Sequence, residues 1–148
     1  MSDETYMSAA LEEAAKAEQL GEVPIGAVIV KNGTIISRGF NRNLTDFDPS
    51  AHAEIVALRA AGATLGNHRM SDCEIFVTIE PCAMCAGALI QARLKRLVYG
   101  TFDPKAGAIQ SVMQVLNHPQ LNHRMEVVSG VLATECSEVI QKFFRKKR

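Results

Sequence analysis

Pro81-Cys82-Ala83-Met84-Cys85 is the stretch of sequence from which the organisation of the chain is best understood. Its two cysteines lie three residues apart behind a proline, and proline is favoured at the first position of a helix. We therefore expect a helix to begin here. Residues i and i+3 share one helical face, so both sulfurs can reach one ion. The positive end of the helix dipole favours thiolates over thiols.

A second short motif, His52-Ala53-Glu54, supplies an imidazole and a carboxylate. One imidazole and two thiolates suit a zinc site whose fourth position is open to water. Zinc lowers the pKa of such a water toward about 7, and a nearby carboxylate can then move its protons. The sequence thus predicts His52, Cys82 and Cys85 as metal ligands and Glu54 as the catalytic proton shuttle. The alternative for Glu54 is a helix residue that faces solvent.

Two other interpretations of the cysteine pair stay open at this point. The pair could be a redox pair, but then His52 and Glu54 would need no special spacing. A structural zinc would need a fourth protein ligand, and none of the candidates is paired with the first three in ligand spacing. These candidates are Cys73, Cys136, His68, His118 and His123. We expect Cys73 and Cys136 to be small core residues.

Size and composition indicate one domain covering residues 1–148. Hydrophobic residues make up 47% and aromatic residues 5%, without any Trp, so aliphatic residues and Ala must fill the core. The four cysteines and the absence of a signal peptide favour a reducing, cytoplasmic location. No apolar run approaches the ~20 residues of a membrane span, so we expect no membrane association of that kind.

A formal net charge of zero conceals an uneven distribution of charge. Residues 1–22 carry six acidic side chains and one lysine. Residues 142–148 carry five basic side chains, interleaved with Phe143 and Phe144, and no acid. A basic cluster with aromatic residues favours a nucleic-acid partner, although most charge runs are only solvated faces.

Hydrophobic periodicity and turn residues predict an alternating α/β order. We expect strands at 25–30, 34–40, 75–78, 96–100 and 126–131, and helices at 3–20, 48–62, 82–92, 108–116 and 134–146. The Asn32-Gly33 turn makes the first two strands an antiparallel hairpin. The other three, separated by helices, should be parallel and joined by right-handed crossovers. The predicted fold is a five-stranded mixed sheet in a three-layer α/β/α sandwich.

The helix expected at 48–62 begins with Asp48-Pro49 as its cap and places His52 and Glu54 near its start. Residues i and i+2 do not share a helical face. A joint site therefore requires the metal to lie beyond the helix end, where side chains that tilt toward the N-terminus can flank it.

His52-Ala53-Glu54 followed by Pro81-Cys82-Ala83-Met84-Cys85 resembles the H-x-E…P-C-x-x-C signature of zinc-dependent nucleobase deaminases. Nearly the whole chain is similar to the bacterial tRNA-specific adenosine deaminases, within the cytidine/deoxycytidylate deaminase superfamily. The stretches that carry this similarity are Val23–Val28, Gly39–Arg42, Thr78–Cys82, Asp103 with Gly107, His118–Arg124 and Phe143–Arg145.

The resemblance implies a cytidine-deaminase-like fold, one Zn²⁺ per chain held by His52, Cys82 and Cys85, and proton transfer by Glu54. It implies hydrolytic deamination of adenosine to inosine at the wobble position of a tRNA anticodon stem-loop, by a homodimer. It also implies that Asn41 bonds the purine and Asp103 the ribose. The remaining residues that it assigns to substrate binding are Ala53, Val28, Phe144 and Arg145.

Each of these assignments has a simpler counterpart. Asn41 could start a turn after a strand, and Asp103-Pro104 could be a plain loop. Phe143 and Phe144 could face the core in part. The alternative enzyme is a deaminase of a free base or nucleoside, such as guanine, cytosine or cytidine, with the same zinc chemistry. A catalytically silent nucleic-acid-binding module with structural zinc is the alternative outside enzymes.

Overall fold

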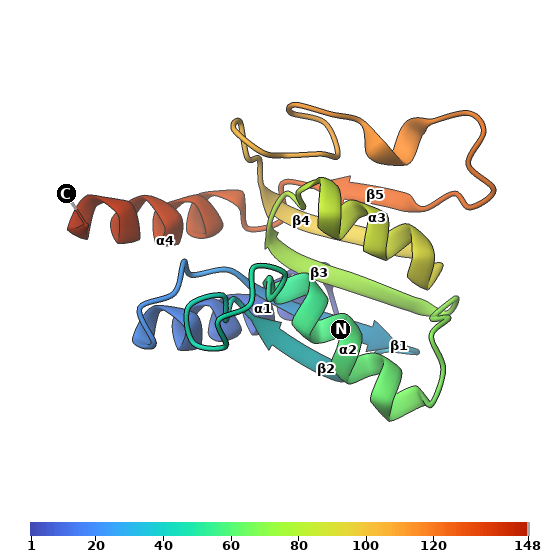
Figure 1. Cartoon of the computed structure of the whole chain (residues 1–148), viewed down its shortest axis with the longest axis horizontal. Helices are drawn as coiled ribbons and strands as arrows, with labels where there is room; N and C mark the ends of the chain where they lie inside the picture. Colours follow the sequence, from blue (N-terminus) through green and yellow to red (C-terminus); the bar gives the residue numbers. More distant parts are fainter. Residues whose placement is uncertain (148) are drawn as a thin grey trace.

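The computed structural model describes residues 1–147, and Arg148 lies outside the described residues. Its centre is one five-stranded sheet in the order β2-β1-β3-β4-β5. Helices α2 and α3 cover one face, and α1 covers the other, joined at one end by the start of α4 (Figure 1). The predicted three-layer α/β/α sandwich with a mixed sheet is therefore confirmed.

The N-terminal half consists of a helix and a hairpin followed by the first helix of the opposite layer. Helix α1 spans Asp3–Gln19, β1 spans Gly26–Lys31, β2 spans Thr34–Phe40 and α2 spans Ala53–Leu65. Asn32 and Gly33 both have positive φ, as the two-residue turn between twisted strands requires. Strand β1 is antiparallel to β2 on one side and to β3 on the other.

The C-terminal half contains the parallel strands. Strand β3 spans Cys73–Ile79, α3 Ala83–Ala92, β4 Arg96–Thr101, β5 Glu126–Ser129 and α4 Ala133–Lys146. Strands β3, β4 and β5 are parallel, as predicted. Their carboxyl ends meet at one edge of the sheet, and α3 begins directly beyond β3. Ligands of open α/β sheets collect at this edge.

Alternation along the strands divides the core between the two faces. Ile75 and Val77 pack under α2 and α3, whereas Phe76 between them packs with α1. Both clusters are dominated by aliphatic side chains and alanine, as the composition predicts. Alanine allows the helix backbones to lie close to the sheet. At Gly39 of β2, any Cβ would collide with the backbone of α2 at Ala53, so this glycine sets the position of the start of α2.

The prediction that a helix begins at Asp48-Pro49 is wrong. Helix α2 begins at Ala53, with His52 as its N-cap. The Asp48 carboxylate accepts hydrogen bonds from the N–H and hydroxyl of Ser50, and the N–H of Arg42 donates to the Ala51 carbonyl. These bonds hold residues 41–51, the first loop, in a folded but non-helical form. Helix α3 likewise begins at Ala83, with Cys82 as its N-cap, rather than at Pro81.

The helix predicted at 108–116 does not form. The segment makes one wide turn in which the N–H groups of Val112 and Met113 both donate to the Gly107 carbonyl. Only a short 3₁₀ helix, η1, follows at Val115–Asn117. Residues 102–112, the second loop, instead fold around the carboxylate of Glu80, which lies at the end of β3.

Candidate metal centre and active site

Three ligand atoms converge between the starts of α2 and α3. His52 Nδ1 lies 3.6 Å from Cys82 Sγ and 3.4 Å from Cys85 Sγ. Tetrahedral zinc with ordinary Zn–N and Zn–S bonds separates its nitrogen and sulfur ligands by about 3.5 Å. The three ligand atoms all lie within 4.8 Å of one another. The predicted ligand set is therefore brought together at separations that fit one zinc ion.

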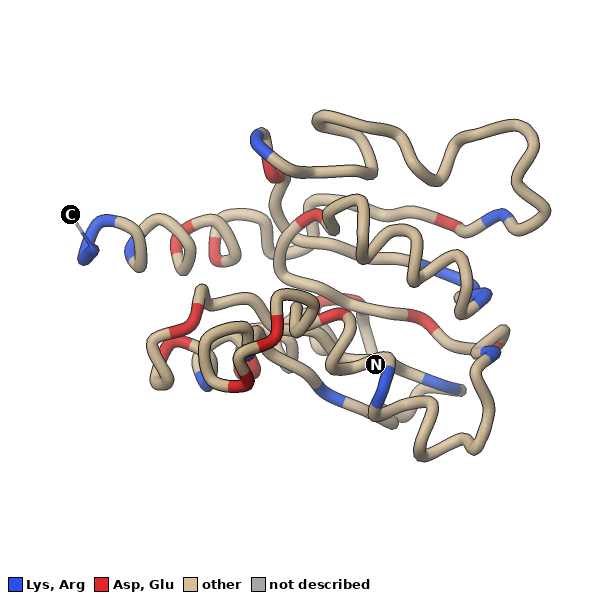
Figure 2. Tube along the Cα trace, viewed as in Figure 1, with Lys and Arg blue, Asp and Glu red and all other residues tan. Residues whose placement is uncertain are grey.

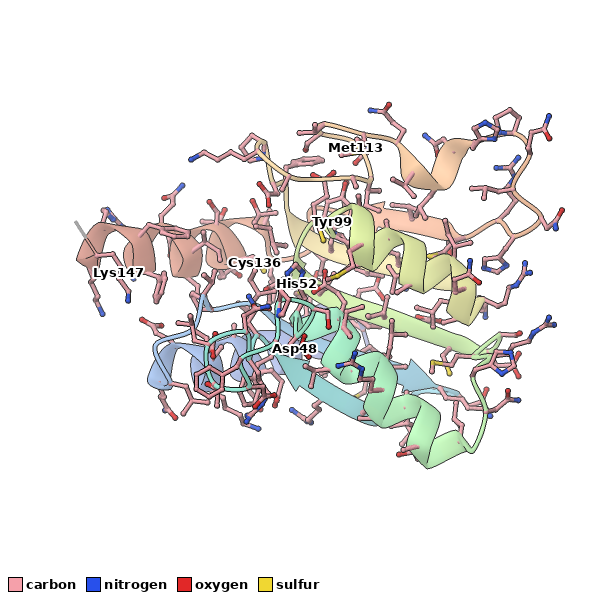
Figure 3. All side chains as sticks on the ribbon, in the orientation of Figure 1. Asp48, His52, Tyr99, Met113, Cys136 and Lys147 are labelled. Atoms are coloured by element: carbon pink, nitrogen blue, oxygen red, sulfur yellow. The ribbon has the colours of Figure 1, made fainter. Side chains whose placement is uncertain are left out.

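Two helix starts supply these ligands. His52 is the N-cap of α2 and Cys82 the N-cap of α3, while Cys85 lies one turn further along α3. In Figure 3, His52 lies between the two helices. A cap residue points beyond the end of its helix, so residues from two helices can face one point in space. The position of the site off the helix ends agrees with the expectation from sequence.

Hydrogen bonding within the group shapes its protonation. The pKa of Cys82 is lowered to about 3, mainly because the Cys85 thiol and then His52 bond its sulfur. The same contact raises the pKa of Cys85, which is also fully buried. The pKa of His52 is raised by its hydrogen bond with Cys82. The group thus holds a thiolate, the form of cysteine that binds metals.

Glu54 is buried in the first turn of α2, with 3% of its surface exposed. Burial raises its pKa to about 7, and the nearby His52 opposes this shift in part. Glu54 does not belong to the metal-ligand group. A carboxyl group with a pKa near neutrality can both accept and return a proton. This environment differs from the solvent-facing alternative considered from the sequence.

Asn41 is buried at the start of the first loop and faces the start of α2. Its Oδ1 accepts a hydrogen bond of 2.8 Å from the N–H of Ala53, and its own N–H donates to the Ile25 carbonyl. Its side-chain carbonyl is therefore occupied, which leaves the amide Nδ2 as the group able to donate to a ligand. Ala53 is itself fully buried, and its backbone fixes this orientation.

Asp103 lies on the second loop, just beyond β4, and is half-buried. Its Oδ1 accepts hydrogen bonds from the N–H groups of Lys105 and Ala106. Asp103 therefore stabilises a local turn, as expected if Asp103-Pro104 is a plain loop. It also lines a cleft of about 950 Å³ between the second loop and α4.

The cleft brings together apolar and basic side chains. Phe144 is 47% exposed on its wall, whereas Phe143 is buried and packs edge-to-face against it. Arg145 and Lys147 of the tail also line the cleft, as does Lys105 across it. Figure 2 shows the basic residues at the C-terminal end of α4. Arg148, the last residue of the basic cluster at 142–148, lies outside the described residues.

Val28 is not brought to this site. Its side chain is fully buried in the cluster formed with α1, on the sheet face opposite α2 and α3. The register of β1 determines which face Val28 occupies, and this register could not be read from the resemblance.

The other candidate ligands lie elsewhere. Cys73 is buried in the core under α2 and α3, and Cys136 is buried against Gly100 on the α1 side. Within residues 1–147, the only group of three or more metal-type ligands is His52, Cys82 and Cys85. This three-residue group, with Glu54 beside it, favours a catalytic over a structural metal.

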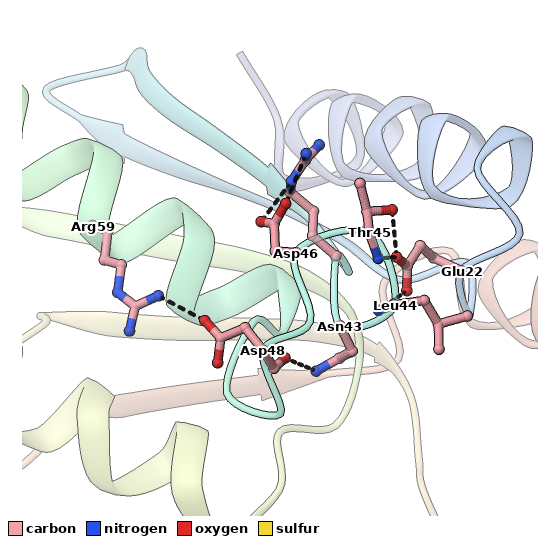
Figure 4. A network of polar contacts seen from close by, with 8 residues as sticks. Glu22, Asn43, Leu44, Thr45, Asp46, Asp48 and Arg59 are labelled. Carbon is pink, nitrogen blue, oxygen red and sulfur yellow. Dashed lines mark hydrogen bonds and ion pairs between the residues drawn. The ribbon is translucent and has the colours of Figure 1, made fainter.

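Sequence reasoning missed two buried glutamates, Glu22 and Glu80, around which the two loops fold. Glu22 accepts hydrogen bonds from the N–H groups of Leu44 and Thr45 and from the Thr45 hydroxyl (Figure 4). Glu80 does the same for the second loop. Burial alone would raise the pKa of both, and the hydrogen bonds outweigh it and lower the pKa of each. No sequence pattern distinguishes such glutamates from exposed ones, although Glu80 precedes the cysteine motif.

None of the described helices is both long and apolar enough to cross a bilayer.

Known proteins resemble this chain over nearly its whole length. A family model described as MafB19-like deaminase matches residues 1–148. The tRNA-specific adenosine deaminase of Haemophilus influenzae is 49% identical, over 99% of this chain and 85% of the relative. The enzyme of the same name from Bacillus subtilis is 47% identical, over 99% and 91%.

Solved structures share the fold. One, from a study of A-to-I editing by tRNA:A34 deaminases at the wobble position of transfer RNA, has a TM-score of 0.88 and 43% identity. It covers 91% of this chain, which in turn covers 98% of it. A guanine deaminase from Nitrosomonas europaea has a TM-score of 0.79 and 24% identity, and the match spans 95% of this chain and 83% of the other. At this identity the likeness shows the fold alone. With a zinc-type ligand triad, a buried glutamate beside it and relatives of this identity, the chain belongs to the deaminase family, among the tRNA-specific adenosine deaminases.

Proposed function

We propose that this protein is a zinc-dependent hydrolase that converts adenosine to inosine at the wobble position of a tRNA anticodon loop. The observation that carries the proposal is the convergence of His52, Cys82 and Cys85 beside the buried Glu54. The similarity to enzymes named tRNA-specific adenosine deaminase supports the choice of substrate.

One Zn²⁺ per chain would be held by His52, Cys82 and Cys85. The donor set and its separations fit zinc with one open coordination position. The chemistry that bound zinc supplies is a water with its pKa lowered toward about 7.

Glu54 performs the proton transfers in this proposal. Its raised pKa of about 7 allows it to take a proton from water and to return it to the purine ring. The water oxygen would bond C6 of the purine, and Glu54 would then take the second proton of that oxygen and pass it to the amino group. The C6–N bond breaks, ammonia leaves, and the oxygen remains on C6 as that of inosine. Burial of Glu54 keeps bulk water from competing for these protons.

Asn41 would orient the base. Because Asn41 Oδ1 accepts the hydrogen bond from the Ala53 N–H, the side chain presents its Nδ2–H donor to the substrate. Such a donor suits a ring nitrogen acceptor of a purine. Asp103, from the other loop, would accept a hydrogen bond from the ribose 2′-OH and so favour RNA over DNA. Each residue comes from a different loop, and the base would lie between the loops.

The cleft beside α4 would receive the nucleotides that flank the target. Phe144 offers an aromatic face for stacking, and Lys105, Arg145 and Lys147 offer charge to phosphates. Because a stacked base hides its exocyclic amine, the substrate must be unpaired or flipped, and an anticodon loop supplies such bases.

A homodimer in the cytoplasm completes the proposal. Met84 at the start of α3, Val112 at the end of the second loop and Met113 directly after it are large exposed apolar side chains, which a second copy could cover. All four cysteines are free, which fits a reducing compartment.

The test is incubation of the zinc-loaded protein with an anticodon stem-loop that carries adenosine at the wobble position. We expect inosine and ammonia from the stem-loop and poor turnover of free adenosine, because the binding energy of flanking nucleotides is missing. E54A should retain zinc and lose turnover, whereas C82S should lose zinc. Efficient deamination of free guanine or cytidine, with no inosine in the stem-loop, would instead assign the chain to the free-base or nucleoside enzymes.

A further inference from the structure

Glu80 lies between α3, the helix whose start carries two of the metal ligands, and the second loop. It follows the last residue of β3 and stands two residues before Cys82. Only 2% of its surface is exposed. Its backbone N–H donates to the Thr101 carbonyl at the end of β4, so its own position is fixed by both strands.

The Glu80 carboxylate accepts hydrogen bonds from five donors of the second loop. Oε2 accepts from the N–H groups of Ile109, Gln110 and Ser111 at 3.0, 2.8 and 2.9 Å. Oε1 accepts from the Asp103 N–H at 3.1 Å and from the Ser111 hydroxyl. Both ends of the second loop therefore meet at the side chain of Glu80, and Glu80 lies two residues before Cys82, the N-cap of α3.

The loop is packed closely around this carboxylate. A Cβ at Gly107 would collide with it, which means that the backbone passes directly over the carboxyl group. The Ala108 N–H also donates to the Pro81 carbonyl at 2.8 Å, and the Tyr99 hydroxyl donates to the Gln110 side chain. The loop cannot move away from α3 without leaving a buried carboxylate unpaired, which is costly.

We propose that Glu80 is a positioning residue for the nucleic-acid substrate. It holds Asp103 at a fixed place relative to Cys82, so that a ribose bonded by Asp103 presents its base to the metal centre. This inference rests on the proposed function through the role of Asp103. Since Asp103 Oδ1 is used by Lys105 and Ala106, Oδ2 is the atom that we expect to meet the ribose hydroxyl.

Glu80→Gln is the variant that tests this with the least change in volume. Its amide oxygen will turn toward the three N–H groups at the Oε2 position, because three donors gather there. Its NH₂ group must then face the Asp103 N–H, and two donors cannot bond each other. The substitution therefore breaks the bond to Asp103 and keeps most of the others.

The experiment compares the zinc-loaded wild type, E80Q, D103A and the double variant on the adenosine stem-loop and on its 2′-deoxyadenosine counterpart. We expect E80Q to raise KM about three- to tenfold, the loss of roughly one hydrogen bond. Turnover per bound zinc should change by no more than about twofold. The ratio of kcat/KM for the adenosine stem-loop to that for its 2′-deoxyadenosine counterpart should decrease. Adding E80Q to D103A should raise KM no further. A wild-type KM and ribose preference in E80Q would overturn the proposal, as would additive effects in the double variant.

Backbone amide exchange provides a readout that does not depend on activity. The Asp103 amide should exchange faster in E80Q than in the wild type, while amides of α1 should be unchanged. If E80Q does not fold, S111A removes only the hydroxyl bond to Oε1 and should shift exchange and ribose preference in the same direction. Wild-type exchange at Asp103 in the folded variant would overturn the proposal. A wild type that forms no inosine would count against the proposed function and not against the attachment of the loop.

Discussion

The two loops beside the metal centre are built by the same device and use it differently. Each folds around one buried glutamate that comes from outside the loop: Glu22 for residues 41–51 and Glu80 for residues 102–112. In the first loop, Asn41 lies at one end and His52 directly follows the other. Hydrogen bonds between the two ends of the loop close it. The Arg42 N–H bonds the Ala51 carbonyl, and Asn41 bonds Ala53. Glu22 bonds only Leu44 and Thr45 at the tip.

In the second loop, the residue expected to meet the substrate is bonded by the glutamate itself. Asp103 donates to Glu80, and Glu80 leads directly into the metal motif. A buried carboxylate can therefore stabilise a loop without affecting the site, or can join the loop to the site. The position of the functional residue relative to the carboxylate decides which role it has.

Gly107→Ala should produce the largest effect and break the second loop only. The new methyl group would collide with the Glu80 carboxylate and the Asp103 carbonyl. We expect the free energy of unfolding to fall by about 3 kcal/mol, at the upper end for overpacking. Denaturant unfolding followed by circular dichroism measures this. Gly87→Ala in α3 is the control, because nothing lies within 4 Å of its Cβ and helix propensity favours Ala. Equal stability of the two variants would contradict the close packing around Glu80.

Sequence reasoning found the metal centre because its chemistry is carried by short motifs. His52, Cys82, Cys85 and Glu54 are recognised by residue type and spacing, whichever loop shapes surround them. The antiparallel hairpin and the three parallel strands were also predictable, since turn residues and alternating hydrophobicity indicate hairpins and crossovers. These signals are local, or depend only on the order of the elements.

The features that sequence reasoning missed depend on contacts between distant residues. Glu80 accepts hydrogen bonds from amides 23 to 31 residues away, and the segment expected as a helix at 108–116 instead turns around this carboxylate. The side of the sheet that Val28 faces depends on its register with β3. Asp48 bonds the N–H of Ser50, but the chain does not continue from there as a helix, and α2 begins only at Ala53. Asp48 has the same cap propensity in either structure, so propensity cannot distinguish them.

Glu22→Gln should lower stability and leave substrate use unchanged, which sharpens the difference between the loops. Its NH₂ group, at a buried position, would face the N–H of Leu44, and neither donor could bond the other. We expect a loss of about 1–2 kcal/mol in the free energy of unfolding. KM for the stem-loop and its ribose preference should equal those of the wild type, in contrast to Glu80→Gln. A raised KM in Glu22→Gln would show that the tip of the first loop also acts on the substrate.

The response of stability to acid should distinguish the same variant from the wild type. Hydrogen bonds lower the pKa of Glu22 in the folded state below its value in the unfolded chain. The stability that this group contributes is therefore present above the unfolded pKa, ~4.3, and is lost as pH falls through the lower folded value. The free energy of unfolding, measured from pH 7 downward, should fall less steeply in Glu22→Gln than in the wild type once the pH is below the unfolded pKa of Glu. An acid limb as steep as that of the wild type would contradict the shift.

Asp46→Asn should have the smallest effect, although it breaks an ion pair of good geometry in the first loop. The Arg42 guanidinium donates to both oxygens of Asp46, at 2.9 and 3.0 Å, and this bond lowers the pKa of the carboxyl group. The pair is exposed, however, so water and salt screen the attraction, and two side chains lose freedom to form it. The first loop keeps the Glu22 bonds and the backbone bond from Arg42 to Ala51 when the pair is lost. We therefore expect no resolvable change in Tm at 0.15 M salt, and at most a small decrease at low salt. A decrease comparable to that of Glu22→Gln, persisting at high salt, would mean that the surface pair and not the buried carboxylate holds the first loop, and the parallel between the two loops would fail.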